Sequence, residues 1–165
     1  MERYLPDDQP LDSITDIGEY NLLHCNLAVE TLENLQSLMN HSDINATEAI
    51  RRSISCLSTL KDVQSVTVRN AETSDATTID LSIKPFDDDS VELATIRVNL
   101  TKHVGDTLEQ IWASYDEHTL SEVMDTAVNL YARMYAYACS GYEAYGIMND
   151  GTVRTVSLRN IEREV

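Results

Sequence analysis

The spacing of the apolar residues changes twice along this chain, and those changes limit the folds that it can adopt. Apolar residues recur every three or four positions in the first third, alternate with polar residues in the middle, and then return to the wider spacing. A period near 3.6 indicates a helix with one buried face, and a period of two indicates a strand. The sequence therefore predicts an α+β fold.

The first third predicts an N-terminal helical hairpin. Leucines at helical spacing indicate a first helix from about 14 to 39. Turn and cap residues follow, and Asn45 with Glu48 three positions later matches the N-cap pair of a second helix over about 46–60. Two helices joined by so short a link are expected to pack antiparallel.

The middle of the chain predicts a three-stranded antiparallel meander. Apolar and polar residues alternate over 65–70, 77–83 and 91–100, and the links between these segments are short enough for hairpins. In the third segment the apolar residues change parity near Ala94, which indicates a bulge or burial on both faces.

The last third predicts a short helix, a long helix and a possible terminal β-hairpin. Cap residues with a glutamate three positions later stand at Asp106 and Thr119, so helices are expected over 107–115 and 120–140. The turn of the hairpin is expected at the Asn-Asp-Gly sequence that ends at Gly151.

We expect one α+β domain over 13–160, with a flexible acidic arm at 1–12 and a frayed tail at 161–165. The predicted helix at 120–140 is apolar around a wide arc. Such a helix lies either at the centre of a core or in an oligomer contact, so a homodimer through this helix is possible.

The charge of the chain restricts its partners. Asp and Glu number 28 against 12 Lys and Arg, which gives a formal net charge of −16. Such a field repels nucleic acid and anionic membranes and attracts basic proteins. The first residues also lack the apolar run of a secretion signal, and no stretch is apolar for long enough to span a membrane. We therefore expect a cytoplasmic protein with a basic protein partner and no direct contact with nucleic acid or membrane.

No pattern of catalytic residues emerges from the sequence, so we expect neither a cofactor nor a metal site. The histidines are scattered, and the glycines do not form a phosphate-binding loop. An enzyme of unknown class built from distant residues stays open, for example from His103 or His118 with Tyr131 or Tyr135. The cysteines are expected to be buried free thiols in a reducing compartment: Cys25, Cys56 and Cys139.

Three consecutive aspartates, Asp87 to Asp89, follow Phe86, the only phenylalanine. A calcium loop needs acidic ligands at alternating positions and a glycine for its sharp turn, and this stretch has neither. A turn between strands is favoured instead. Phe86 either anchors that turn on the core or presents an aromatic ring beside a negative patch.

These features lead to a hypothesis and two alternatives. We expect a non-enzymatic inhibitor or immunity-type protein, such as a mimic of DNA charge, that blocks a basic nuclease or nucleic-acid-binding protein. The alternatives are a dimeric chaperone or adaptor that binds an extended peptide, and a small cytosolic enzyme. The predicted partner-binding residues are Phe86, Asp87, Asp88, Asp89, Asp116, Glu117, Glu122 and Asp125.

Overall fold

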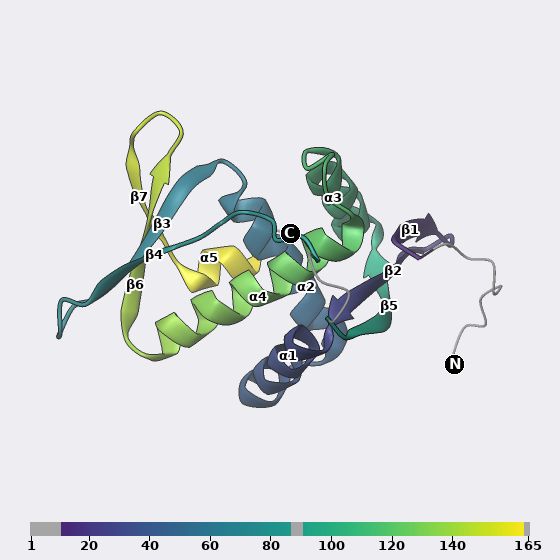
Figure 1. Ribbon diagram of the computed structural model, residues 1–165, viewed down its shortest axis with the longest axis horizontal. Helices are drawn as coiled ribbons and strands as arrows, with labels where there is room; N and C mark the ends of the chain where they lie inside the picture. Colours follow the sequence, from purple (N-terminus) through teal and green to yellow (C-terminus); the bar gives the residue numbers. More distant parts are fainter. Residues whose placement is uncertain (1–10, 87–90, 164–165) are drawn as a thin grey trace.

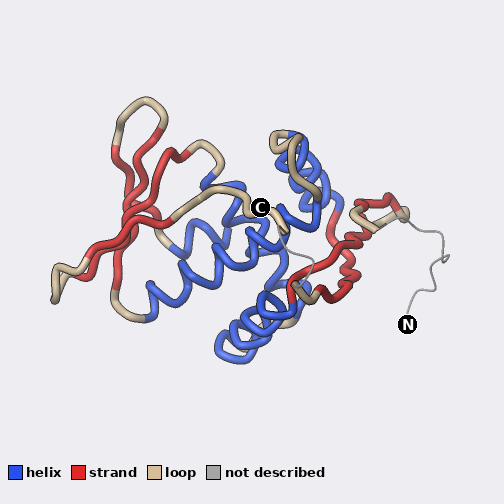
Figure 2. The backbone as a smooth tube through the Cα atoms, viewed as in Figure 1, coloured by secondary structure: helices blue, strands red, loops and turns tan. Residues whose placement is uncertain are grey.

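The computed structural model of the protein describes residues 11–86 and 91–163. In space, two antiparallel sheets lie at opposite ends of the described structure, and the helices lie between them (Figures 1 and 2). The predicted α+β class is confirmed. The elements in chain order are β1 (Ser13–Asp16), β2 (Tyr20–Ala28), α1 (Val29–Ser42), α2 (Ala46–Leu60), β3 (Val63–Asn70), β4 (Ala76–Ile79), β5 (Leu93–Thr101), α3 (Lys102–Ala113), α4 (Leu120–Cys139), β6 (Tyr142–Met148), β7 (Val153–Val156) and α5 (Leu158–Arg163).

The same series of strand, helix, helix and β-hairpin occurs twice in this order. The first unit, 20–79, contains β2, α1, α2, β3 and β4, and the second unit, 93–156, contains β5, α3, α4, β6 and β7. The units meet through antiparallel pairing of β2 with β5 and of β3 with β6, and through packing of α2 against α4. In Figure 1, α1 and α3 lie on opposite sides of α4, and the two hairpins turn away from each other. An approximate twofold axis therefore relates the units.

The register of β2 with β5 places this axis between His24 and Arg97, which face each other. Measured back from the start of α1 and of α3, these two residues occupy corresponding positions in their units. The burial of the helices repeats as well, with Thr31, Leu35 and Leu38 in α1 matching Val104, Leu108 and Ile111 in α3. In α2 and α4 the matching buried pairs are Ala49 and Val123, Ile50 and Met124, Ile54 and Val128, Leu57 and Tyr131, and Leu60 and Met134.

The predicted helix over 14–39 is wrong in its first half, where the structure has strands β1 and β2. Strand β2 is the middle strand of its sheet, and it is buried on both faces: Leu23 and Leu27 face the core, while Leu22 and His24 point the other way and are also buried. A strand buried on both faces loses the alternating pattern. Its leucines then imitate a helical period.

The predicted meander is correct only for its first two strands. Strands β3 and β4 form an antiparallel hairpin, but β5 pairs with β2 in the other sheet. Strand β4 also ends at Ile79, before the end predicted at 83, because the Asp80 carboxylate accepts hydrogen bonds from the backbone N–H and the hydroxyl of Ser82 and turns the chain.

Helices α2 and α4 begin where their cap residues predict. Asn45 accepts a hydrogen bond from the Glu48 N–H at the start of α2, and Thr119 and Glu122 form a capping box at the start of α4. Helix α3, by contrast, begins at Lys102 instead of 107, because the Thr101 hydroxyl caps it. Asp106, the expected cap, lies inside this helix.

The terminal hairpin of β6 and β7 is confirmed, and Gly151 in its turn has a φ of 86°. The apolar arc of α4 is buried from Leu120 to Met134, where the helix packs against α1, α2 and β2, but Tyr135 and Tyr137 are only partly buried and Ala138 is exposed. A homodimer through this helix stays a prediction.

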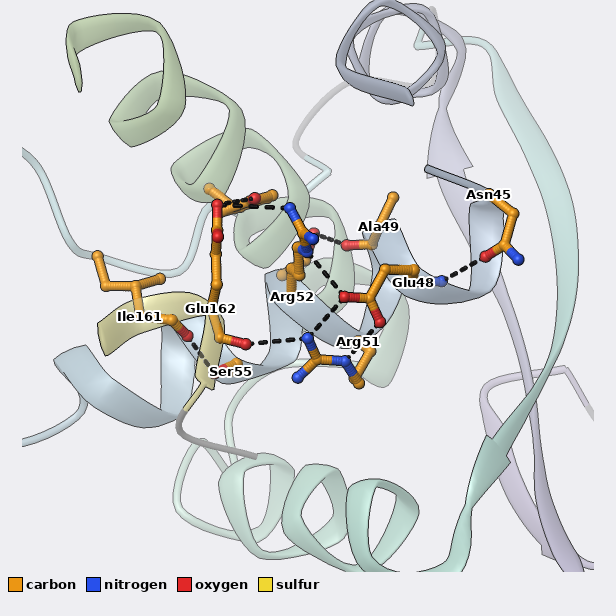
Figure 3. A network of polar contacts seen from close by, with 10 residues as sticks. Asn45, Glu48, Ala49, Arg51, Arg52, Ser55, Ile161 and Glu162 are labelled. Atoms are coloured by element: carbon orange, nitrogen blue, oxygen red, sulfur yellow. Dashed lines mark hydrogen bonds and ion pairs between the residues drawn. The ribbon is translucent and has the colours of Figure 1, made fainter. Parts of the chain in front are cut away.

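The frayed tail expected from 161 is wrong for residues 161–163, which belong to helix α5. Ile161 is fully buried, and its carbonyl accepts a hydrogen bond from Ser55 of α2 (Figure 3). The Glu162 carbonyl accepts from Arg51, and the Glu162 carboxylate accepts from Tyr131 of α4. Polar contacts therefore fix α5 across the pair of central helices.

Replacing Ile161 with alanine is expected to lower the free energy of unfolding by about 2–5 kcal/mol, because the buried side chain leaves a cavity. Chemical denaturation at pH 7 measures this loss. The matched control is Arg159→Ala in the same helix, where the side chain is exposed and the expected change is within about 0.5 kcal/mol. Equal, small losses in both variants would contradict the docking of α5.

Candidate functional site

Four of the predicted partner-binding residues lie at the N-terminal end of α4. Asp116 and Glu117 are exposed in the loop before the helix, Glu122 is in its first turn, and Phe86 contacts that turn. The structure thus brings together residues that are far apart in the sequence. Asp87, Asp88 and Asp89 lie outside the described residues.

Glu122 is the centre of this arrangement. One carboxylate oxygen accepts a hydrogen bond from the Thr119 N–H at 2.9 Å, and the other accepts from the Phe86 N–H at 2.8 Å. The ring of His118 lies 3.7 Å from the same carboxylate. Glu122 therefore closes the capping box and also holds the segment before β5 against α4.

These contacts change the acidity of Glu122. Burial by itself opposes ionisation, but the hydrogen bonds from the N–H groups of Thr119 and Phe86 and from the Thr119 side chain favour the charged form, as does His118. Their combined effect lowers the pKa of Glu122 below its ordinary value. The carboxylate is thus fixed as an anion by contacts within the fold.

Asp125 is one turn further along α4 and is buried. Its carboxylate accepts a hydrogen bond from the Ala28 N–H at 2.9 Å and another from the Asn129 side chain at 3.3 Å. These bonds satisfy backbone at the end of β2, so this predicted site residue stabilises the fold. A partner reaches Asp116 and Glu117 far more easily.

Two partly buried aromatic residues lie beside these exposed acids and were not predicted as site residues. The Trp112 indole N–H donates to the His118 carbonyl at 3.1 Å, which holds the end of α3 against the loop. Burial raises the pKa of Tyr115, and the negative charge of Asp62 raises it further, so Asp62 lies near this ring. Asp62 comes from the α2–β3 link, more than 50 residues away, and no local pattern indicates this proximity.

We define the acidic aromatic patch as Asp62, Trp112, Tyr115, Asp116 and Glu117. Within the described part of the chain, no ion pair reaches Asp116 or Glu117. Aromatic rings beside uncompensated carboxylates provide both apolar contact and negative potential to a partner. This combination is suited to binding a cationic protein surface.

Phe86 borders a pocket of about 540 Å³ on the other side of Glu122. Its ring is partly buried, and the pocket also contains polar groups from α1 and α4, among them Thr31, Asn129 and Arg133. The Asn129 amide donates to the Thr31 hydroxyl at 2.9 Å. Phe86 thus lines a polar pocket and does not belong to the acidic aromatic patch.

The pairs suggested for a catalytic site take other partners in the structure. Tyr131 donates to Glu162 at 2.8 Å, and Tyr135 contacts His41 at 2.6 Å. Burial raises the pKa of Tyr131, which keeps its phenol protonated. In the two described ranges, no group of three His, Cys, Asp or Glu side chains is close enough to hold a metal ion.

Two of the three cysteines are buried as predicted, but Cys139 at the end of α4 is exposed. Burial raises the pKa of Cys25 and of Cys56, so both stay neutral thiols. Their neutral state fits a packing role.

Searches with family models, against curated proteins and against solved structures each return no match to this chain. Among the described helices, none combines the length and apolar character needed to cross a membrane.

Replacing Glu122 with glutamine is expected to lower the free energy of unfolding at pH 7 by about 1–2 kcal/mol, since the amide cannot keep both charged hydrogen bonds. A lowered pKa contributes stability above the ordinary pKa, and this contribution is lost as pH falls through the lowered value. The gap between wild type and variant should therefore shrink on acidification.

Denaturation curves from pH 7 down to pH 3 measure this gap. Glu117→Gln is the control, because Glu117 is exposed and its loss should change stability by no more than about 0.5 kcal/mol. A Glu122→Gln variant as stable as wild type at pH 7 would show that the carboxylate does not hold the site together.

Proposed function

We propose that this protein is a non-enzymatic binding protein of the inhibitor or immunity type, which blocks a basic, nucleic-acid-binding or nuclease partner. The acidic aromatic patch carries this proposal. Its carboxylates attract a cationic surface and speed association, while Trp112 and Tyr115 provide apolar contact that slows dissociation.

The distribution of ion pairs supports the same conclusion. Several cations are neutralised within the fold: Arg51 and Arg52 by Glu48, Lys84 by Asp80, and Lys102 by Asp16. Four cations are thus paired within the fold, while Asp116 and Glu117 have no ion pair in the described ranges. The net charge of −16 attracts a basic partner.

Direct binding of nucleic acid is disfavoured by charge. The net charge of −16 repels the phosphate backbone of nucleic acid.

The test measures how a basic partner responds to charge at the patch. Immobilised full-length protein captures partners from the native host at low salt, and the released partner is then titrated against two double variants with equal charge change. Asp116→Asn with Glu117→Gln removes charge at the patch, and Glu72→Gln with Asp75→Asn removes it from the exposed β3–β4 turn.

The patch variant should slow association at least roughly 10-fold and the turn variant less than about 2-fold, because steering depends on local potential. Affinity for the wild type should fall as salt rises. Equal effects of both variants, or a captured partner that is neutral or acidic, would refute the proposal.

A further inference from the structure

The two outer edges of the β2–β5 pair are related by the approximate twofold axis, yet they differ in what covers them. On the β2 side, β1 pairs with residues 21–24. Beyond β1, the Ser121 hydroxyl accepts a hydrogen bond from the Asn26 N–H at 2.8 Å, and Asp125 accepts from the Ala28 N–H at 2.9 Å. The outer edge of β2 is therefore paired over its whole length.

The same bonds show which groups of β5 point outward. The N–H groups of Asn26 and Ala28 point away from β5. The backbone N–H and C=O groups of the residues between them and before them, such as Cys25, therefore point toward β5. Cys25 is opposite Ile96, so Ile96 bonds to β2, and its neighbours in β5 direct their N–H and C=O groups to the free edge. The alternate residues Thr95, Arg97 and Asn99 therefore direct their backbone N–H and C=O groups outward.

Within the described ranges, no further strand pairs with this edge. Strand β5 pairs only with β2 there, and its outward residues Thr95, Arg97 and Asn99 are exposed. The positions in α2 that match Ser121 and Asp125 of α4 are Thr47 and Arg51. Thr47 is exposed, and Arg51 bonds to Glu48 and to the Glu162 carbonyl instead.

We propose that the outer edge of β5 receives an extended, positively charged segment of a partner protein, which adds to the sheet as a further strand. This inference rests on the proposed function and specifies how the basic partner is held. An open edge of nine residues without proline is a ready template for strand addition. Residues 94–97 of this edge match residues 21–24 of β2, the stretch with which β1 pairs.

Overall charge favours a basic segment as the occupant, and the exposed acids Glu30 and Glu92 near this edge outnumber its one exposed cation, Arg97. A second copy of the chain would bring another −16 to the contact, and Coulomb repulsion opposes such a pairing. The Val29 N–H bonds to the Glu92 carbonyl, so the first turn of α1 lies beside the start of β5. This contact brings two exposed acids, Glu30 and Glu92, to that end of the edge.

The experiment uses the full chain and a synthetic nine-residue peptide in which lysine alternates with valine and threonine. Thr95→Pro removes an outward N–H, and Thr95→Ala is its control, since both lose the side-chain bond to Asn26 but alanine keeps the N–H. Fluorescence anisotropy should show similar affinity in wild type and Thr95→Ala, within about 2-fold. Thr95→Pro should bind at least roughly 10-fold more weakly.

A second readout does not depend on the proline variant folding. In the wild type, NMR should show that the peptide protects the amides of Thr95, Arg97 and Asn99 from hydrogen exchange. Equal affinity of the proline and alanine variants, peptide binding without this protection, or no binding at about 1 mM would overturn the strand-addition proposal. The charge-steered function would survive that failure if the patch variant still slowed the captured partner.

Two controls test the choice of occupant. A peptide with glutamate in place of lysine should bind at least roughly 10-fold more weakly than the basic one. A 20-base-pair DNA duplex should leave the three amides unprotected. Protection by the duplex, or equal binding of both peptides, would overturn a basic protein segment as the occupant.

Discussion

Backbone pairing between β2 and β5 is the interaction on which the rest of the molecule depends. It joins two strands separated by more than 60 residues and sets the two units antiparallel, with His24 opposite Arg97. Once this register is fixed, α2 meets α4, and β3 meets β6 at the other end of the helices. Leu23 and Val98 face the shared core from opposite units. Each unit alone would leave an apolar helix face and a sheet edge exposed to water, so burial of these surfaces couples the folding of both.

Local patterns predicted much of the secondary structure but not the pairing of the two units. The caps at Asn45 and Thr119 fix the starts of α2 and α4 because a side chain within three residues satisfies each backbone group. The sequence of strand β2 resembles a helix because burial on both faces removes its alternation. The repeat is hidden in the sequence because the two units share few residues. Its traces are Asn-Leu before both α1 and α3, and a glutamate at the third position of both α2 and α4.

The candidate site was predicted in part for the same reason. The exposure of Asp116 and Glu117 is predictable from the sequence, because both stand in a charged loop before a capped helix. The proximity of Asp62 to Tyr115 is not, because it depends on how distant parts of the chain pack. Asp125 shows the opposite case, since an acid that looks available in the sequence is used to pair β2. The departure from twofold symmetry at Asp125 of α4, where α2 has Arg51, therefore identifies an acid that holds the fold together.

Residue-resolved hydrogen exchange of the full chain in the absence of any partner tests this asymmetric arrangement most directly. The account requires the amides of Asn26 and Ala28 to be protected by Ser121 and Asp125, and the outward amides of Thr95 and Asn99 to be open. The open amides should exchange at least roughly 100-fold faster than the protected pair. Equal protection at the two edges would contradict an unpaired β5, and equal rapid exchange would contradict the pairing of β2.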